Sequence, residues 1–147
     1  MPWNKRYKGQ GTRRKKHKNV DTVREKQMKY PSREEMLVYI EQHLPDIGQK
    51  LRRLKEKEPF LKQKNVYGEP YSDRQIDICC DALFQTEYLR CRILDTTSQE
   101  AKSVKELAGI LEEEPNDVLR EVVELRRRNL LILEIIKDRT PFYRAAK

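Results

Sequence analysis

The sequence lacks the features that mark membrane and secreted proteins. No apolar run in its 147 residues approaches the roughly 18 residues of a membrane-spanning helix. The basic start is followed by no apolar stretch, so we expect no secretory signal. The three cysteines, Cys79, Cys80 and Cys91, form no even disulfide framework and suit a reducing compartment. These absences favour a cytoplasmic protein without membrane contact.

Motifs for catalysis and metal binding are missing as well. The sequence contains no Gly-rich phosphate loop, nucleophile motif or paired-carboxylate motif, so we expect no enzyme and no cofactor. The cysteines lack the C-x₂₋₄-C spacing and the second ligand pair of a zinc site. We interpret them as small buried hydrophobic residues. His17 and His43 have no ligand partner at metal spacing, so we expect no metal.

Positive charge is concentrated at the start of the chain. The net charge is +8, and residues 1–31 hold 11 Lys and Arg against two acidic residues. This segment has too few apolar residues to offset the entropy of ordering, so we expect a disordered basic tail. Its densest cluster is typical of nucleic-acid contact, and Trp3 and Tyr7 could stack on unpaired bases. The expected contacts are Arg13, Arg14, Lys15, Lys16 and Lys18.

Residues 32–64 have the pattern of an amphipathic helical segment. Ser32 with Glu35 forms a capping box, and apolar residues then recur every three or four positions. Pro45 predicts a break or kink, and the helix should end before Pro59. The apolar stripe favours packing, or a homodimer formed through residues 33–58. Residues 65–72, with Gly68 and Pro70, are predicted to be a linker.

Residues 73–147 predict three helices followed by two short strands. The first helix should span about 73–96, Ser103 should cap a short second helix with Glu106 as its partner, and Pro115 should open the third. Asn129 is suited to ending that helix in the left-handed conformation. Strands are expected at 130–137 and 142–144, separated by a turn at 138–141. The core positions predicted for the third helix are Val118, Leu119, Val122, Val123 and Leu125.

This order resembles the winged helix-turn-helix family. The resemblance is carried by residues 103–108, 115–123, 125–131 and 142–143, and it covers the C-terminal half only. It implies a mainly α fold with a small β-wing, in which the third helix enters the DNA major groove and the wing touches the backbone. The contacts that it implies are Asn116, Arg120, Arg127 and Arg128 on the third helix, with Lys137, Arg139 and Arg144 on the wing.

The acidic residues of the third helix leave two functions open. Asp117, Glu121 and Glu124 are expected on its exposed face, where they would repel phosphates and suit a protein partner instead. One hypothesis is a DNA-binding transcriptional regulator, with RNA as the other nucleic acid that fits. The alternative is a non-catalytic subunit or adaptor of a larger protein or ribonucleoprotein assembly, in which the winged helix contacts protein.

Overall fold

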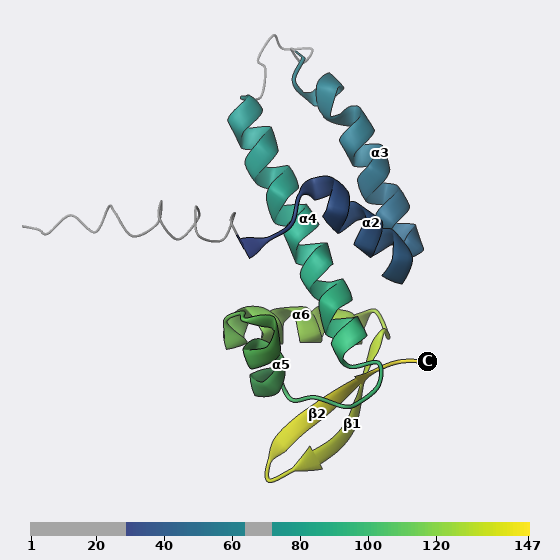
Figure 1. Cartoon of the computed structure of the whole chain (residues 1–147), viewed down its shortest axis with the longest axis vertical. Coiled ribbons are helices and arrows are strands. Elements are labelled where there is room, and N and C mark those ends of the chain that lie inside the picture. The colour runs from purple at the N-terminus through teal and green to yellow at the C-terminus, as the bar shows by residue number, and fades with distance from the viewer. Residues whose placement is uncertain (1–28, 64–71) are drawn as a thin grey trace, which may run out of the picture. The chain divides into compact units, whose positions relative to one another are not determined.

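The computed structural model describes residues 29–63 and 72–147. The chain divides into two compact units, residues 1–31 and 32–147, and only residues 29–31 of the first are described. The expectations for the basic tail and for most of the linker therefore lie outside the described residues. Within residues 32–147 the described part is mainly helical and ends in an antiparallel β-hairpin (Figure 1). Its elements are α2 (Arg33–His43), α3 (Pro45–Leu61), α4 (Asp73–Thr96), α5 (Val104–Leu111), α6 (Pro115–Arg127), β1 (Leu131–Lys137) and β2 (Thr140–Ala145).

Local signals place most helix ends where they were predicted. The hydroxyl groups of Ser32 and Ser103 accept hydrogen bonds from the third residue of their helices, which completes both predicted capping boxes. Ser72 does the same for α4 with Gln75, in a capping box that was not predicted from the sequence. Pro115 is the first residue of α6, and Asn129 follows that helix with a φ of 59°. Backbone hydrogen bonds beyond its end reach back to Leu125 and Arg126, as in a Schellman motif.

The two prolines of the first helical segment behave differently. Pro45 separates α2 from α3, as expected, and takes the first position of α3. The predicted end before Pro59 is wrong, because α3 continues through it to Leu61. A proline inside a helix lacks the donor for the carbonyl four residues earlier, and its ring crowds that carbonyl, so it weakens the preceding turn without ending α3.

The first half of α4 packs against α2 and α3. Figure 1 shows α2 lying across both helices. Met36, Leu37 and Ile40 of α2 are buried, so this part of the apolar stripe packs within the chain, and the homodimer through residues 33–58 stays a prediction. Arg33 fastens the three helices together: its guanidinium donates hydrogen bonds to Asp81 and to Glu58, both at 2.6 Å.

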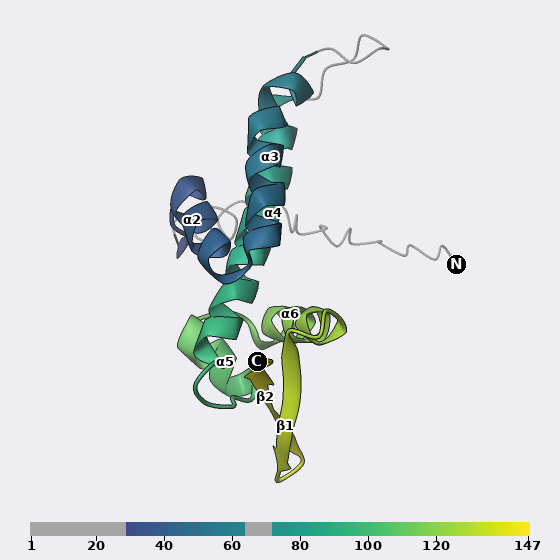
Figure 2. The ribbon, with the colours of Figure 1, turned by 90° about the vertical axis from the view of Figure 1, so that its right-hand side faces the viewer.

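The second half of α4 forms the main core with α5, α6 and the hairpin (Figure 2). The buried residues of this cluster are Leu89, Ile93, Leu107, Ala108, Leu111, Val118, Val122, Leu125, Leu131 and Tyr143. Leu119 and Val123 were predicted to belong to it, and this is wrong: they are 45% and 50% exposed. With 3.6 residues per turn, Val118, Val122 and Leu125 share one side of α6, and Leu119 and Val123 lie on the other.

The hairpin closes with a shorter turn than expected. Asp138 and Arg139 both have positive φ, as in the two-residue turns that match strand twist. Thr140 and Pro141 therefore pair with Lys137 and Ile136, and β2 begins two residues before the predicted strand. On its other side, β2 forms an isolated bridge at Tyr143 with Lys102, which precedes α5.

The cysteines lie in two environments. Cys80 and Cys91 are 5% and 0% exposed, in agreement with the prediction. Cys79 is exposed, so its predicted burial is wrong: on a helix, adjacent residues point about 100° apart. Burial raises the pKa of the Cys80 thiol to about 11, with a contribution from Glu58. Burial and the nearby Glu87 raise that of Cys91 to about 12.

Two glycines provide a matched test of helix packing. An alanine Cβ at Gly48 would lie 2.8 Å from the Cα of Glu41 in α2, whereas at Gly109 it would meet no described heavy atom within 4 Å. Gly48→Ala should lower the free energy of unfolding by about 1–3 kcal/mol through overpacking. Gly109→Ala should raise it by about 0.5–1 kcal/mol, because alanine is the better helix former. Urea denaturation of both variants measures this. Stabilisation by both would show that α2 and α3 do not approach closely at Gly48.

Cys91 should stabilise the fold as a neutral thiol. Cys91→Ala should lower the free energy of unfolding by roughly 1 kcal/mol, while the exposed Cys79→Ala should change it by less than about 0.5 kcal/mol. Because the pKa of Cys91 is raised by folding, the unfolded chain loses this proton first. Stability should therefore fall as pH rises from about 9 towards 12. Between pH 8 and pH 10, the free energy of unfolding measured by denaturation should fall less for Cys91→Ala than for the parent protein. An equal fall would contradict a buried neutral thiol.

Candidate functional site

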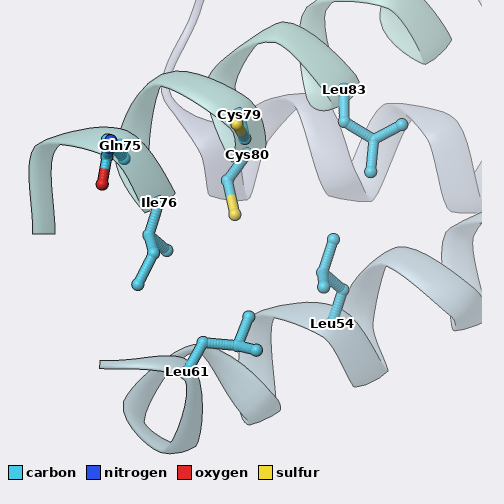
Figure 3. A pocket seen from close by; sticks show the side chains of 7 residues that line it. All are labelled: Leu54, Leu61, Gln75, Ile76, Cys79, Cys80 and Leu83. Carbon is cyan, nitrogen blue, oxygen red and sulfur yellow. The ribbon is translucent and has the colours of Figure 1, made fainter. Parts of the chain in front are cut away.

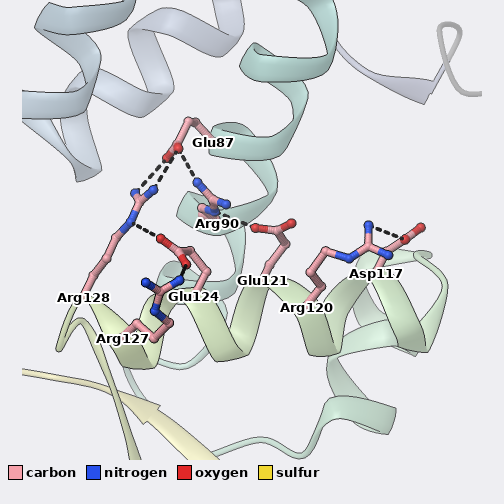
Figure 4. Close-up of polar contacts among 8 residues, drawn as sticks. All are labelled: Glu87, Arg90, Asp117, Arg120, Glu121, Glu124, Arg127 and Arg128. Carbon is pink, nitrogen blue, oxygen red and sulfur yellow. Dashed lines mark hydrogen bonds and ion pairs between the residues drawn. The ribbon is translucent and has the colours of Figure 1, made fainter.

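Buried ion pairs fix how α6 sits against α4. The Nε of Arg90 donates a hydrogen bond to Glu121 of α6 at 2.5 Å, and its Nη1 bonds Glu87 of α4 (Figure 4). Glu87 and Glu121 are 4% and 8% exposed. The prediction that Glu121 lies on the exposed face is therefore wrong. A charged residue is buried here because it has a charged partner.

Arg128 extends the same network. Its Nε donates to Glu124 at 3.1 Å, and its two terminal nitrogens reach Glu87 at 3.4 Å. Burial lowers the pKa of Arg128, but the carboxylates of Glu87 and Glu124 more than offset this and hold it above the ordinary value. The hydrogen bond from Arg128, opposed by burial, lowers the pKa of Glu124. Of the arginines predicted to touch nucleic acid, Arg128 is thus already held by two carboxylates.

The opposite side of α6 faces solvent. Helical spacing places Asn116, Leu119, Arg120, Val123 and Arg127 along one stripe, and all five are exposed. We call these residues the outward stripe. The side chains of Arg120 and Arg127 are 75% and 77% exposed. The structure therefore brings together three of the four predicted contacts of this helix and leaves Arg128 on the inner side.

The outward stripe contains no acidic residue. Asp117 lies beside it, 34% exposed, with its carboxylate 3.8 Å from Arg120. Glu124 is 28% exposed and is bonded by Arg127 and Arg128, both at 3.1 Å. The carboxylates of Asp117, Glu121 and Glu124 thus each have an arginine partner, and that of Glu121 is paired with α4, through Arg90 (Figure 4).

A shallow hollow borders the stripe on the side of the hairpin. It is lined by Val122, Val123, Arg126, Arg127 and Tyr143. The guanidinium of Arg126 lies 5.8 Å from the centre of the Tyr143 ring, within the range of a cation–π contact. Arg126 was not among the contacts predicted from the sequence, although its place three residues after Val123 puts it beside the stripe.

The hairpin carries both charge and exposed apolar surface. Lys137 and Arg139 are exposed, and the Lys137 ammonium lies 5.7 Å from the centre of the Phe142 ring. Arg144 is held by Glu134 at 2.8 Å and by the Gln99 carbonyl at 3.1 Å. Six of the seven residues of β1 are exposed. The large aliphatic ones among them are Ile132, Leu133, Ile135 and Ile136.

A second apolar surface lies between α3 and α4. A hollow of about 370 Å³ opens where the two helices have few contacts (Figure 3). Cys79 and Cys80 both border it. The remaining lining residues are Leu54, Leu61, Gln75, Ile76 and Leu83.

Two further properties concern only residues 29–63 and 72–147. Among these residues, no three His, Cys, Asp or Glu side chains gather where they could hold a metal ion. None of the helices there combines the length and the apolar character needed to cross a bilayer. Arg13, Arg14, Lys15, Lys16 and Lys18 lie outside the described residues, and their nucleic-acid contacts stay a prediction.

The Arg90–Glu121 pair should be far more stabilising than the surface pair of the same helix. Glu121→Ala leaves Arg90 inside the protein with one partner fewer, so the free energy of unfolding should fall by on the order of 3 kcal/mol. Arg127→Ala removes an exposed pair and should change it by less than about 1 kcal/mol. Thermal and urea denaturation compare the two. Equal, small effects would mean that Glu121 does not anchor α6 to α4.

No protein-family model, no curated protein and no solved structure matches this chain. What the protein does is therefore inferred from its own residues, first of all from the outward stripe of α6.

Proposed function

We propose that this chain is a nucleic-acid-binding protein and acts as a DNA-binding transcriptional regulator of winged helix type. The observation that carries the proposal is the outward stripe of α6. It presents Asn116, Arg120 and Arg127 to solvent, while Glu121 is bonded to Arg90 of α4 and the stripe itself holds no carboxylate. Burial of Glu121 and the arginine partners of Asp117 and Glu124 lessen the repulsion of phosphates that the sequence alone suggested.

The arrangement of the C-terminal elements supports the proposal. The order α4, α5, α6 and hairpin is the order of a winged helix domain, with α6 as the recognition helix and the hairpin as the wing. The isolated bridge between Lys102 and Tyr143 joins the segment before α5 to the hairpin. In this family the recognition helix enters the major groove and the wing follows the backbone.

Each group then has a defined task. Arg120 and Arg127 carry guanidinium groups that can donate two hydrogen bonds to guanine or contact phosphate, and Asn116 can pair with adenine. Lys137 and Arg139, exposed at the hairpin tip, contact the backbone. The basic cluster of the first 31 residues adds affinity that does not depend on sequence, through release of counterions.

The second candidate function is an adaptor that binds another protein through the wing. It is favoured by one observation: Ile132, Ile135 and Ile136 are between 44% and 62% exposed on a single strand. Phosphates offer no partner for such side chains, whereas protein interfaces bury them. The two functions are compatible in one molecule, since they use α6 and β1.

Binding of the full-length protein to a random duplex pool tests the proposal. Arg120→Ala and Arg127→Ala should each weaken binding to the selected site by about 5- to 150-fold if they contact bases, and less if they contact phosphate only. Arg74→Ala, an exposed arginine at the start of α4, is the matched control and should leave binding unchanged. Single-stranded RNA and duplex RNA serve as competitors.

A different pattern of binding would reject the regulator proposal. If neither α6 variant weakens binding, and removal of residues 1–28 abolishes it, the tail alone binds nucleic acid. The regulator proposal would then be abandoned in favour of the adaptor.

A further inference from the structure

Two aliphatic side chains lie in the middle of the cationic stripe of α6. Leu119 and Val123 are 45% and 50% exposed and stand one helical turn apart. They contribute little to the core, because Val118, Val122 and Leu125, all 0% exposed, fill it from the inner side. Their place between Asn116, Arg120 and Arg127 makes them part of whatever surface these residues contact.

The surface that they contact must offer both negative charge and small apolar groups. The stripe holds two arginines with highly exposed side chains, whose surface pairs with Asp117 and Glu124 a phosphate can replace, and it holds no acidic residue, so it complements a polyanion. In the major groove, phosphates and the polar base edges satisfy the arginines and Asn116. The apolar group present there is the 5-methyl of thymine, which aliphatic side chains contact.

We propose that Leu119 and Val123 are specificity-determining residues that contact thymine methyl groups. The inference rests on the proposed function, and it names the class of site: duplex DNA with thymines next to the bases read by Arg120 and Arg127. Residues four apart are separated by about 6 Å along a helix, and successive bases by about 3.4 Å along a strand. The two side chains therefore address two different base pairs, about two steps apart.

Replacing thymine by deoxyuridine isolates the methyl group. The substitution leaves the hydrogen-bonding edges of the base unchanged and removes only that group. Affinity of the full-length protein for its selected duplex should fall about fourfold for each contacted methyl, the effect expected for one buried methyl-sized group. Leu119→Ala and Val123→Ala should weaken binding to the thymine site and lose this sensitivity at one base each. The matched control is Ile78→Ala, an exposed aliphatic residue of α4 (51% exposed), which should keep the full sensitivity.

The outcomes separate this inference from the proposed function. If Arg120→Ala weakens binding while deoxyuridine has no effect, the regulator proposal stands and the thymine contact is wrong. If Leu119→Ala and Val123→Ala remain as sensitive to deoxyuridine as the parent protein, other residues contact the methyl groups, and the assignment to Leu119 and Val123 is also wrong. If the protein selects no duplex site, both proposals fail. Unchanged melting temperatures of the exposed variants confirm that folding is not the cause.

Discussion

The hydrogen bonds that Arg90 makes to Glu87 and Glu121 control the rotation of α6 about its own axis. A carboxylate this deeply buried must keep its charged partner, so Glu121 has to face α4. Because an α-helix has 3.6 residues per turn, the orientation of Glu121 determines which side of α6 each of the remaining residues occupies. Val118, Val122 and Leu125 enter the core, Arg128 joins the buried network, and the outward stripe faces solvent.

Helix α4 takes part in two groups of buried residues, one with α2 and α3 and the other with α5, α6 and the hairpin. Its first half is covered by α2 and α3 and fastened by Arg33, and its second half holds α5, α6 and the hairpin. A displacement of α2 against α4 would break the hydrogen bonds of Arg33, which lie at the first half of α4, whereas the hydrogen bonds of Arg90 lie at its second half. The backbone of α4 is continuous from Asp73 to Thr96 and joins the two halves.

Features that depend on neighbours in sequence were predictable, and features that depend on distant contacts were not. Ser32, Ser103, Pro115 and Asn129 act through backbone groups a few residues away, so their patterns indicated the helix ends. The burial of Glu121 needs Arg90, thirty-one residues earlier in the chain, and the close approach at Gly48 needs Glu41 of another helix. For the candidate site, the sequence placed Asn116, Arg120 and Arg127 on the exposed side of α6, where the structure has them, and their contact with nucleic acid stays a prediction. It also assigned Leu119 and Val123 to the core, because an apolar residue alone does not reveal which side the core lies on.

The register shift in the middle of β1 affects how readily copies of the protein associate through this strand. An aliphatic strand with a free edge is a template for association between molecules, and β1 pairs only with β2 among the described strands. Its register shifts between Leu133 and Ile135, at Glu134, whose charge is held by Arg144. Such a bulge interrupts the even spacing of backbone donors and acceptors that an incoming strand needs. The hairpin can therefore expose four aliphatic side chains and still have less tendency to assemble into extended sheets than a strand of regular register would have.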